Sequence, residues 1–238
     1  MTHATAEVMR PPFPAERGVD VYNNKLGMWV FLASDVMFFT ALIGSYIILR
    51  FGVREPWAQP NAVLNVPLTA FNTFLLICSS VSMVKAYAAI ADGKQYFLRR
   101  VPGQALWDGG LKFWLLVTII GGAMFVGVQI YEYIKLVGHG LTPAGFREAS
   151  QMAEHALADP VKYGATTAGL YGSTFFTMTG FHGFHVTCGV ISMTYLYFTK
   201  VLPEKYSAQD HRGIETIGLY WHFVDLVWII LFTIVYLI

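Results

Sequence analysis

The stretch "YGSTFFTMTGFHGFHVTCGVISMTYLYF", from Tyr171 to Phe198, decides which class of fold the chain adopts. It contains no Asp, Glu, Lys or Arg, and it exceeds the roughly 20 apolar residues that a helix needs to cross a bilayer. It nevertheless carries two histidines, His182 and His185, near its middle. Polar groups in the hydrocarbon core are costly, so the stretch predicts a membrane-spanning helix whose histidines face protein.

The composition of the whole chain agrees with a membrane protein. Of its 238 residues, 55% are hydrophobic and only 13% are charged, whereas soluble domains average about 25% charged residues. The formal net charge of +1 gives no reason to expect nucleic acid as a partner. Cys78 and Cys188 form no CxxC pair, so neither a disulfide framework nor a zinc site is predicted.

Five stretches are long and apolar enough to span a membrane, at about 26–49, 64–90, 113–136, 166–199 and 215–238. We therefore expect an all-α, polytopic protein in which residues 26–238 form one five-helix transmembrane domain. Residues 1–25 lack the apolar core of a signal peptide, and their "RPPFP" predicts an extended cytoplasmic arm.

The distribution of lysine and arginine along the chain predicts its orientation in the membrane. With a cytoplasmic N-terminus, eleven of these residues fall on the cytoplasmic side and five on the other. The positive-inside rule then favours a cytoplasmic N-terminus and a periplasmic C-terminus, as five spans require. Of the two long connections, 91–111 is expected to be an irregular loop. In 137–162, Thr142 as N-cap and Pro143 predict a surface helix to about Leu157, or else a plain solvated connector.

Polar residues inside the spans follow helical stripes. The fourth span has one stripe and the fifth another, formed respectively by Phe175, Met178, His182, His185, Gly189 and Ser192, and by Glu215, Gly218, His222 and Asp225. A haem between His185 and His222 would need both at one depth, but their positions differ by roughly 10 Å along the membrane normal. We therefore expect an interhelical polar network of His182, His185, Glu215, His222, Asp225 and Glu132, with carboxylates as partners of the imidazoles. For Glu132, an interfacial pair with Lys135 is a sufficient explanation.

Asp35 lies in the first span, within "FLASDVMFF", with Phe31, Leu32, Phe38 and Phe39 as helical neighbours. A carboxyl group that can be neutral or charged in apolar surroundings is a candidate for handling protons. A permanently protonated hydrogen-bond donor to another helix is the equally open alternative. Neither a Walker A loop, a GxGxxG, a CxxCH nor a GxSxG is present, so we predict no catalytic residue, no metal ligand and no cofactor of the chain's own.

Five motifs together resemble those of a known family: "GMWVFLASDVMFFTALIGSY" (27–46), "FNTFLLICSSVSM" (71–83), "QIYEY" (129–133), "GLYGSTFFTMTGFHGFHVTCG" (169–189) and "GIETIGLYWHFVDLVWIILF" (213–232). They resemble subunit III of the haem–copper respiratory oxidases, which comprise cytochrome c and quinol oxidases. The resemblance covers nearly all of the chain from residue 22 onward. It is to the short bacterial form of the family, which keeps five helices and lacks the first two of the long forms.

The resemblance implies a non-redox subunit of an aerobic, proton-pumping terminal oxidase in the bacterial inner (plasma) membrane. Haem and copper would lie in partner subunits I and II, phospholipids would bind to this chain, and other respiratory complexes are further candidate partners. The subunit would support stability and proton uptake. Asp35 matches an intramembrane carboxylate that is Glu in many relatives, and Lys200 matches a basic position where a lipid phosphate could bind.

Other functions stay open at this point. A relative serving a quinol oxidase or a nitric oxide reductase would have the same fold. A stand-alone b-type cytochrome would need haem in the purified chain, and a small transporter with Asp35 as its proton site would need substrate flux without any oxidase.

Overall fold

The structure, a computed structural model, describes residues 22–99, 108–206 and 210–237, so most of the predicted arm 1–25 lies outside it. Five long helices occur in these ranges: α1 (Asn23–Gly52), α3 (Val66–Ala91), α4 (Leu111–His139), α7 (Ala168–Leu196) and α8 (Arg212–Phe232). A π-helical turn extends α7 as η1 (Tyr197–Val201) and α8 as η2 (Thr233–Leu237). Each long helix begins and ends within a few residues of a predicted span.

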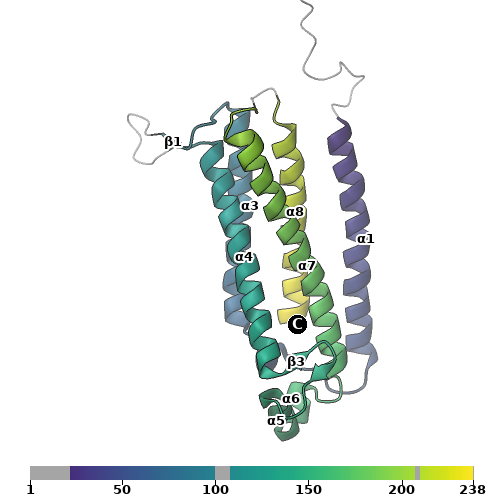
Figure 1. The fold of residues 1–238 in the computed structure, drawn as a ribbon. Coiled ribbons are helices and arrows are strands. Elements are labelled where there is room, and N and C mark those ends of the chain that lie inside the picture. The colour runs from purple at the N-terminus through teal and green to yellow at the C-terminus, as the bar shows by residue number, and fades with distance from the viewer. Residues whose placement is uncertain (1–21, 100–107, 207–209, 238) are drawn as a thin grey trace, which may run out of the picture.

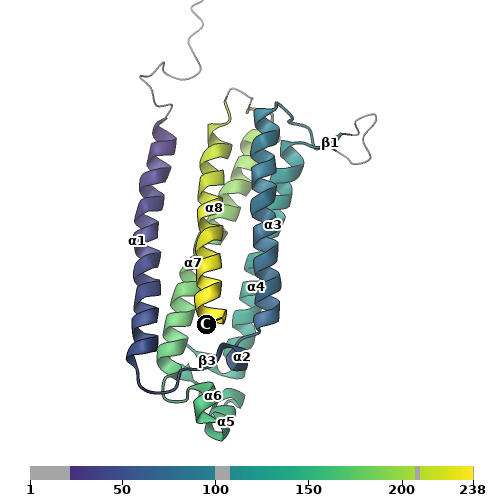
Figure 2. The same cartoon turned by 180° about the vertical axis from the view of Figure 1, so that it is seen from behind.

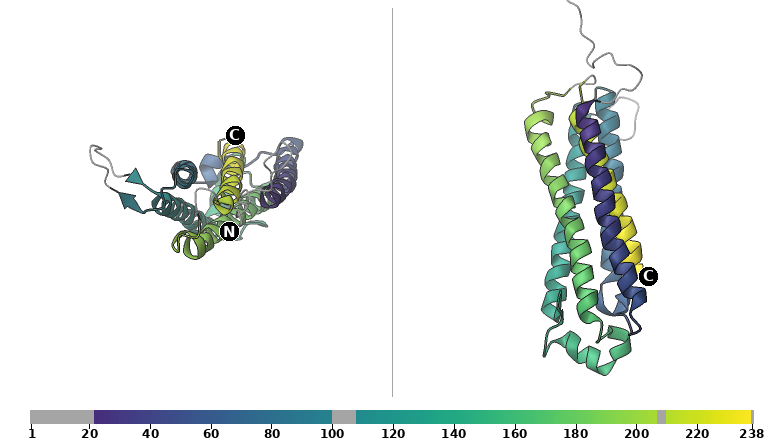
Figure 3. Two further views of the ribbon diagram at one scale, coloured as in Figure 1. Left: turned by 90° about the horizontal axis from the view of Figure 1, so that it is seen from above. Right: turned by 90° about the vertical axis from the view of Figure 1, so that its right-hand side faces the viewer.

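Successive long helices run in alternating directions along one bundle axis (Figure 1). The reverse view shows α8 between α1 and α3, with α7 and α4 behind it (Figure 2). α8 packs against α1, α3 and α7, while α4 packs against α3 and α7. α1 lies at one edge of the bundle, and of its 30 residues only Asp35, Phe39 and Tyr46 are buried (Figure 3).

Short elements form the connections. They are α2 (Pro60–Val63), α5 (Gln151–Ala158), α6 (Pro160–Tyr163) and two antiparallel pairs, β1 (Leu98–Arg99) with β2 (Asp108–Gly109) and β3 (Leu141–Thr142) with β4 (Gly145–Phe146). The prediction of a helix starting at Thr142 is wrong. Thr142 Oγ1 instead donates to the Gly145 carbonyl at 2.7 Å, and Gly145 has a φ of 114°, which no helix contains. The helix begins only at Gln151, after Ser150 accepts a bond from the Ala153 amide.

Four helices of the described part are long and apolar enough to cross a membrane, namely α1, α3, α4 and α8 with its η2 extension. α7 is as long as α4 but is not among them, because Gly, Ser, Thr and His occupy much of its length. The protein is thus an all-α, multi-pass membrane protein with four candidate spans. The exposed apolar side chains on α1, α3 and α4, such as Met37, Phe71 and Ile134, suit contact with lipid.

Aromatic side chains fill the centre of the bundle, with Trp221, Trp228, Phe125, Phe175 and Tyr171 almost fully buried. Gly122 on α4 permits this packing. A Cβ at that position would lie 2.5 Å from Trp221 Cη2 and 2.8 Å from Val190 Cγ2, so only glycine lets α4 approach the indole so closely.

Candidate functional site

Asp35 on α1 meets His185 on α7 across the loosest seam of the bundle. Asp35 Oδ2 lies 3.5 Å from His185 Nε2, and the two side chains are 11% and 14% exposed. That oxygen has no hydrogen-bond partner among the described residues, so the two groups are in contact without a well-formed bond. The other ring nitrogen, Nδ1, lies 2.7 Å from the carbonyl of Phe181, one turn earlier. The sequence had not indicated this contact, because the partner of Asp35 comes from a helix that is distant along the chain.

His182 is buried in aromatic surroundings. Its ring stacks on Trp228 with centroids 4.8 Å apart and meets the edge of Phe125 at 5.9 Å. Neither ring nitrogen has a hydrogen-bond partner within the described ranges. The expectation that a carboxylate fixes the tautomer of this imidazole is therefore wrong, because His182 points into the aromatic core while the carboxylates lie at other seams.

His222 on α8 meets the hydroxyl of Ser80 on α3, with His222 Nδ1 and Ser80 Oγ 2.6 Å apart. Ser80 is also a hydrogen-bonding neighbour of Asp225, one turn further along α8. Asp225 is 8% exposed and its Oδ1 has no partner among the described residues. Imidazole, hydroxyl and carboxylate thus form one group at the α3–α8 seam.

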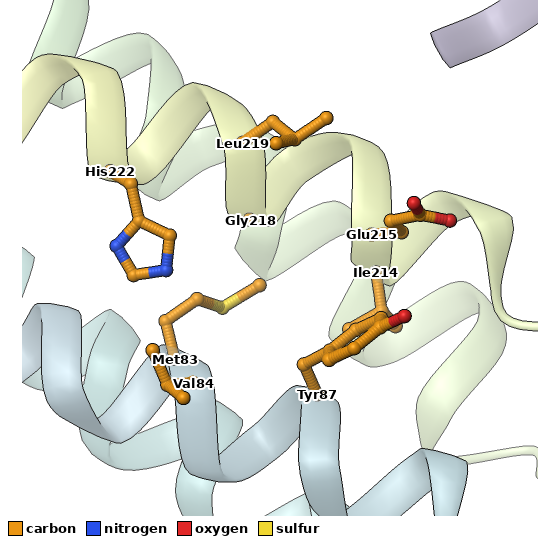
Figure 4. A pocket seen from close by; sticks show the side chains of 8 residues that line it. All are labelled: Met83, Val84, Tyr87, Ile214, Glu215, Gly218, Leu219 and His222. Atoms are coloured by element: carbon orange, nitrogen blue, oxygen red, sulfur yellow. The ribbon is translucent and has the colours of Figure 1, made fainter.

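A cavity of about 250 Å³ begins at His222 and follows the same seam. Met83, Val84 and Tyr87 line it from α3, and Ile214, Glu215, Gly218, Leu219 and His222 line it from α8. Figure 4 shows the imidazole turned into the cavity beside Met83, with Tyr87 and Glu215 at the opposite end. Most of the wall is apolar, so the few polar groups at its two ends would orient a ligand.

Glu132 is buried at the junction of α3, α4 and η2. Its Oε1 accepts a bond from Thr69 at 3.0 Å and its Oε2 accepts one from Tyr236 at 3.2 Å. The predicted pair with Lys135 is not formed. Lys135 Nζ instead lies 4.9 Å from the centre of the Tyr131 ring, because the lysine turns outward while Glu132 turns into the bundle.

Glu215 joins α8 to the start of α1. Lys25 Nζ lies 2.6 Å from Glu215 Oε1, and the Tyr22 hydroxyl donates to Oε2 at 3.0 Å. Partial burial of the Tyr22 hydroxyl, more than the bonds that oppose it, raises its pKa to about 12. The first turn of α8 therefore holds the entry of α1.

The six residues of the predicted network do not form one network. His222 and Asp225 share Ser80 at the α3–α8 seam, and the other four lie in separate groups. Among the described residues, no hydrogen bond or ion pair links one group to the next. Sequence reasoning missed the partners Ser80, Thr69 and Tyr236, whose hydroxyls look like ordinary helix-packing groups. Lys200 is exposed in η1. Within the described ranges, no group of three or more His, Cys, Asp or Glu is placed to hold a metal ion.

Comparison of the sequence with known proteins identifies the family of this chain. The family described as Cytochrome c oxidase subunit III matches residues 151–238. Cytochrome c oxidase subunit 3 of Thermostichus vulcanus is 32% identical over 212 residues, which cover 89% of this chain and 86% of that protein. The probable quinol oxidase subunit 3 of Staphylococcus haemolyticus is 31% identical over 218 residues, covering 90% and 89%. With similarity over about nine tenths of both chains, this protein belongs to the cytochrome c oxidase and quinol oxidase subunit III family.

Proposed function

We propose that the chain is the non-redox subunit III of a terminal oxidase, and that it stabilises and supplies protons to a catalytic partner that contains the haem and copper. The observation that carries this proposal is the likeness to named oxidase subunits along nine tenths of the chain. The bundle agrees with it, because polar side chains such as Glu132, His222 and Asp35 lie in helix–helix seams, where they join helices to one another.

In the proposed topology all five long helices span the bacterial inner membrane, with the N-terminus in the cytoplasm. α7 crosses as the fourth span in chain order, in addition to the four candidate spans, because its length matches that of α4 and it packs inside the same bundle. Glu215, Lys25 and the β1–β2 pair then lie on the cytoplasmic side, and β3, β4, α5 and α6 lie on the periplasmic side (Figure 1). Cysteine-accessibility labelling of single-cysteine variants at either end tests this orientation.

Purification of the tagged full-length chain from its native membrane tests the function. Co-purification of a haem- and copper-containing subunit is the expected result. A c-type haem or a copper centre in a further partner identifies cytochrome c as the electron donor, and its absence together with quinol-driven oxygen uptake identifies a quinol oxidase. Stoichiometric haem in the chain alone, or solute transport by it in liposomes, would refute the proposal.

Asp35 is the proposed proton-linked residue, because its carboxylate and the His185 imidazole form an acid–imidazole contact at the edge helix. Asp35→Asn is expected to assemble and to start turnover at the wild-type rate, and then to lose sustained activity or proton uptake. Ser34→Ala is the matched control, since the exposed Ser34 hydroxyl only donates to the Phe31 carbonyl. If Asp35→Asn behaves like Ser34→Ala in all three measurements, Asp35 is a structural group.

Phospholipids are the proposed small-molecule partners. Lys200 is exposed just past the end of α7, where an ammonium group would meet a lipid phosphate in the cytoplasmic leaflet. Lys200→Gln should reduce the anionic lipid retained by the purified complex, as measured by mass spectrometry, with Lys205→Gln as the control beyond the π-helical turn.

A further inference from the structure

The cavity between α3 and α8 is open toward the surroundings of the bundle. Val84 and Tyr87, which line it, are 52% and 39% exposed. His222 lies seven residues beyond Glu215, so the cavity reaches roughly 10 Å inward from the first turn of α8. A ligand would enter sideways from the hydrocarbon phase, which selects for an amphipathic, membrane-dissolved molecule.

The inner end of the cavity presents a hydrogen-bond acceptor. The Ser80 hydroxyl can donate to the Asp225 carboxylate, and Ser80 Oγ then accepts from Nδ1–H of His222 at 2.6 Å. With its proton on Nδ1, the imidazole directs an unprotonated Nε2, which is a hydrogen-bond acceptor, toward the cavity (Figure 4). A ligand that carries a hydroxyl group can satisfy this nitrogen, whereas a carbonyl or an ether oxygen cannot.

The outer end presents a second polar group at a defined distance. Tyr87 lies seven residues along α3 from Ser80, again roughly 10 Å, and its hydroxyl is directed to the end of the cavity where Glu215 lies (Figure 4). The roughly 10 Å is a rise along the α3 backbone, so a ligand that bonds at both ends of the cavity needs oxygens on opposite sides of its body. Oxygens at the para positions of one six-membered ring are placed in this way.

The walls between these ends suit a flat ring. Met83 supplies a thioether, which packs well on aromatic rings. Gly218 leaves the opposite wall without a side chain, and a Cβ there would lie 3.3 Å from Met83 Cε. A cavity of about 150 Å³ accepts benzene, so about 250 Å³ is enough for a substituted ring.

We propose that this cavity binds the ring of a membrane hydroquinone with a para pair of hydroxyl groups, one donating to His222 Nε2 and the other paired with Tyr87. Its alkyl or isoprenoid tail leaves past Val84 into the lipid. The proposal concerns binding alone, involves no electron transfer, and holds whichever electron donor the oxidase uses.

The test uses the full-length chain in the assembly that purifies with it from its membrane. The probe is a hydroquinone whose alkyl tail carries a photoactivatable diazirine beside the ring, and the readout is the labelled peptides by mass spectrometry. Labelling is expected to concentrate on the segments 83–87 and 214–222. Decyl-hydroquinone should suppress it, and the dimethyl ether should compete about ten-fold more weakly, since one lost hydrogen bond is worth about ten-fold in affinity.

Two variants isolate the cavity. Gly218→Leu fills it, and only the flexible end of Met83 must move, so labelling of these two segments should fall about ten-fold. Gly127→Leu on α4 is the control, because a Cβ there meets nothing within 4 Å, and it should label like the wild type. Tyr87→Phe keeps the packing and should weaken competition several-fold.

Equal labelling of other lipid-facing helices, equal competition by the ether, or full labelling of Gly218→Leu would overturn the proposal. So would the absence of label from both segments, since a partner protein would then cover this face. Co-purification of the oxidase subunits is scored separately on the same samples, so that a failure of the proposed function is distinguished from a failure of this site.

Discussion

Glu132 gives a prediction in which a second mutation should repair the first. The two carboxylate oxygens accept bonds from Thr69 and Tyr236, and no cation pairs with Glu132 among the described residues. Replacement by leucine keeps the bulk of the side chain and removes both acceptors. Thr69 keeps a partner, because its hydroxyl also donates to the Asn65 carbonyl at 3.1 Å. Tyr236, only 3% exposed, loses the one hydroxyl partner that the structure gives it.

The magnitude follows from this asymmetry. A buried donor left unpaired costs about 1–3 kcal/mol, whereas replacing both members of a bonded pair by apolar groups of similar shape is nearly neutral. Glu132→Leu should therefore lower the free energy of unfolding by about 2 kcal/mol. Tyr236→Phe alone should cost about 1–2 kcal/mol, because it leaves Oε2 of the carboxylate without its donor. The double variant should be more stable than Glu132→Leu by about 1 kcal/mol or more.

The assay is reversible unfolding of the detergent-solubilised full-length chain by increasing mole fractions of sodium dodecyl sulfate, followed by tryptophan fluorescence. Lys135→Gln is the control, and it should change stability by less than about 0.5 kcal/mol because Lys135 has no contact with the carboxylate. Strictly additive losses in the double variant would refute the reasoning, as would a Glu132→Leu chain as stable as the wild type.

Three other substitutions test separate parts of the structure. His182→Phe should keep or raise stability by up to about 1 kcal/mol, since the imidazole is buried without a hydrogen-bond partner among the described residues; a large loss measured in the same unfolding assay would reveal a partner. Gly122→Leu should prevent folding or cost more than about 3 kcal/mol, because its Cβ would meet Trp221 at 2.5 Å, whereas Gly127→Ala should be tolerated; size-exclusion profiles distinguish them. Tyr22 has a pKa raised to about 12, so its stabilising effect is complete below pH 10 and is lost as pH rises toward 12; Tyr22→Phe should flatten that part of the stability–pH curve.

The fold was predictable because its main determinant is local. A run of apolar residues long enough to span a bilayer has to satisfy its backbone within itself, so span positions follow from composition alone. α4, predicted at 113–136 and observed at Leu111–His139, illustrates how closely ends can be placed. The prediction of a helix start at Thr142 failed because the structure of that segment depends on non-local contacts. Its hairpin depends on Gly145 at positive φ and on contacts with α7, and an N-cap pattern reports neither.

The contacts of the polar residues could not be predicted from the sequence. Helical spacing places His185 on the polar stripe of its helix, and its side chain does face α1, because the period is a property of one helix. Which groups meet depends on the rotation and height of two helices relative to each other. Glu132 and Lys135 are three residues apart and would pair on an isolated helix, yet the carboxylate turns to Thr69 and Tyr236 on other elements.

The separation of the polar groups also constrains how this chain can handle protons. Asp35 and His185 meet at the α1–α7 seam, His222 and Ser80 at the α3–α8 seam, and Glu132 at the junction of α3, α4 and η2. Aromatic rings such as Trp228 and Phe125 fill much of the space between, and His182, which lies among them, has no hydrogen-bond partner at either ring nitrogen among the described residues. A proton bound at Asp35 therefore has no continuous hydrogen-bonded relay of described side chains across the bundle, and it must leave by the side from which it came or through a neighbouring polypeptide. α1, with three buried residues, lies on the open edge where such a neighbour can reach the carboxylate. Proton uptake that depends on Asp35 should accordingly appear only in the assembled oxidase, and its persistence in the isolated chain reconstituted in liposomes would contradict this argument.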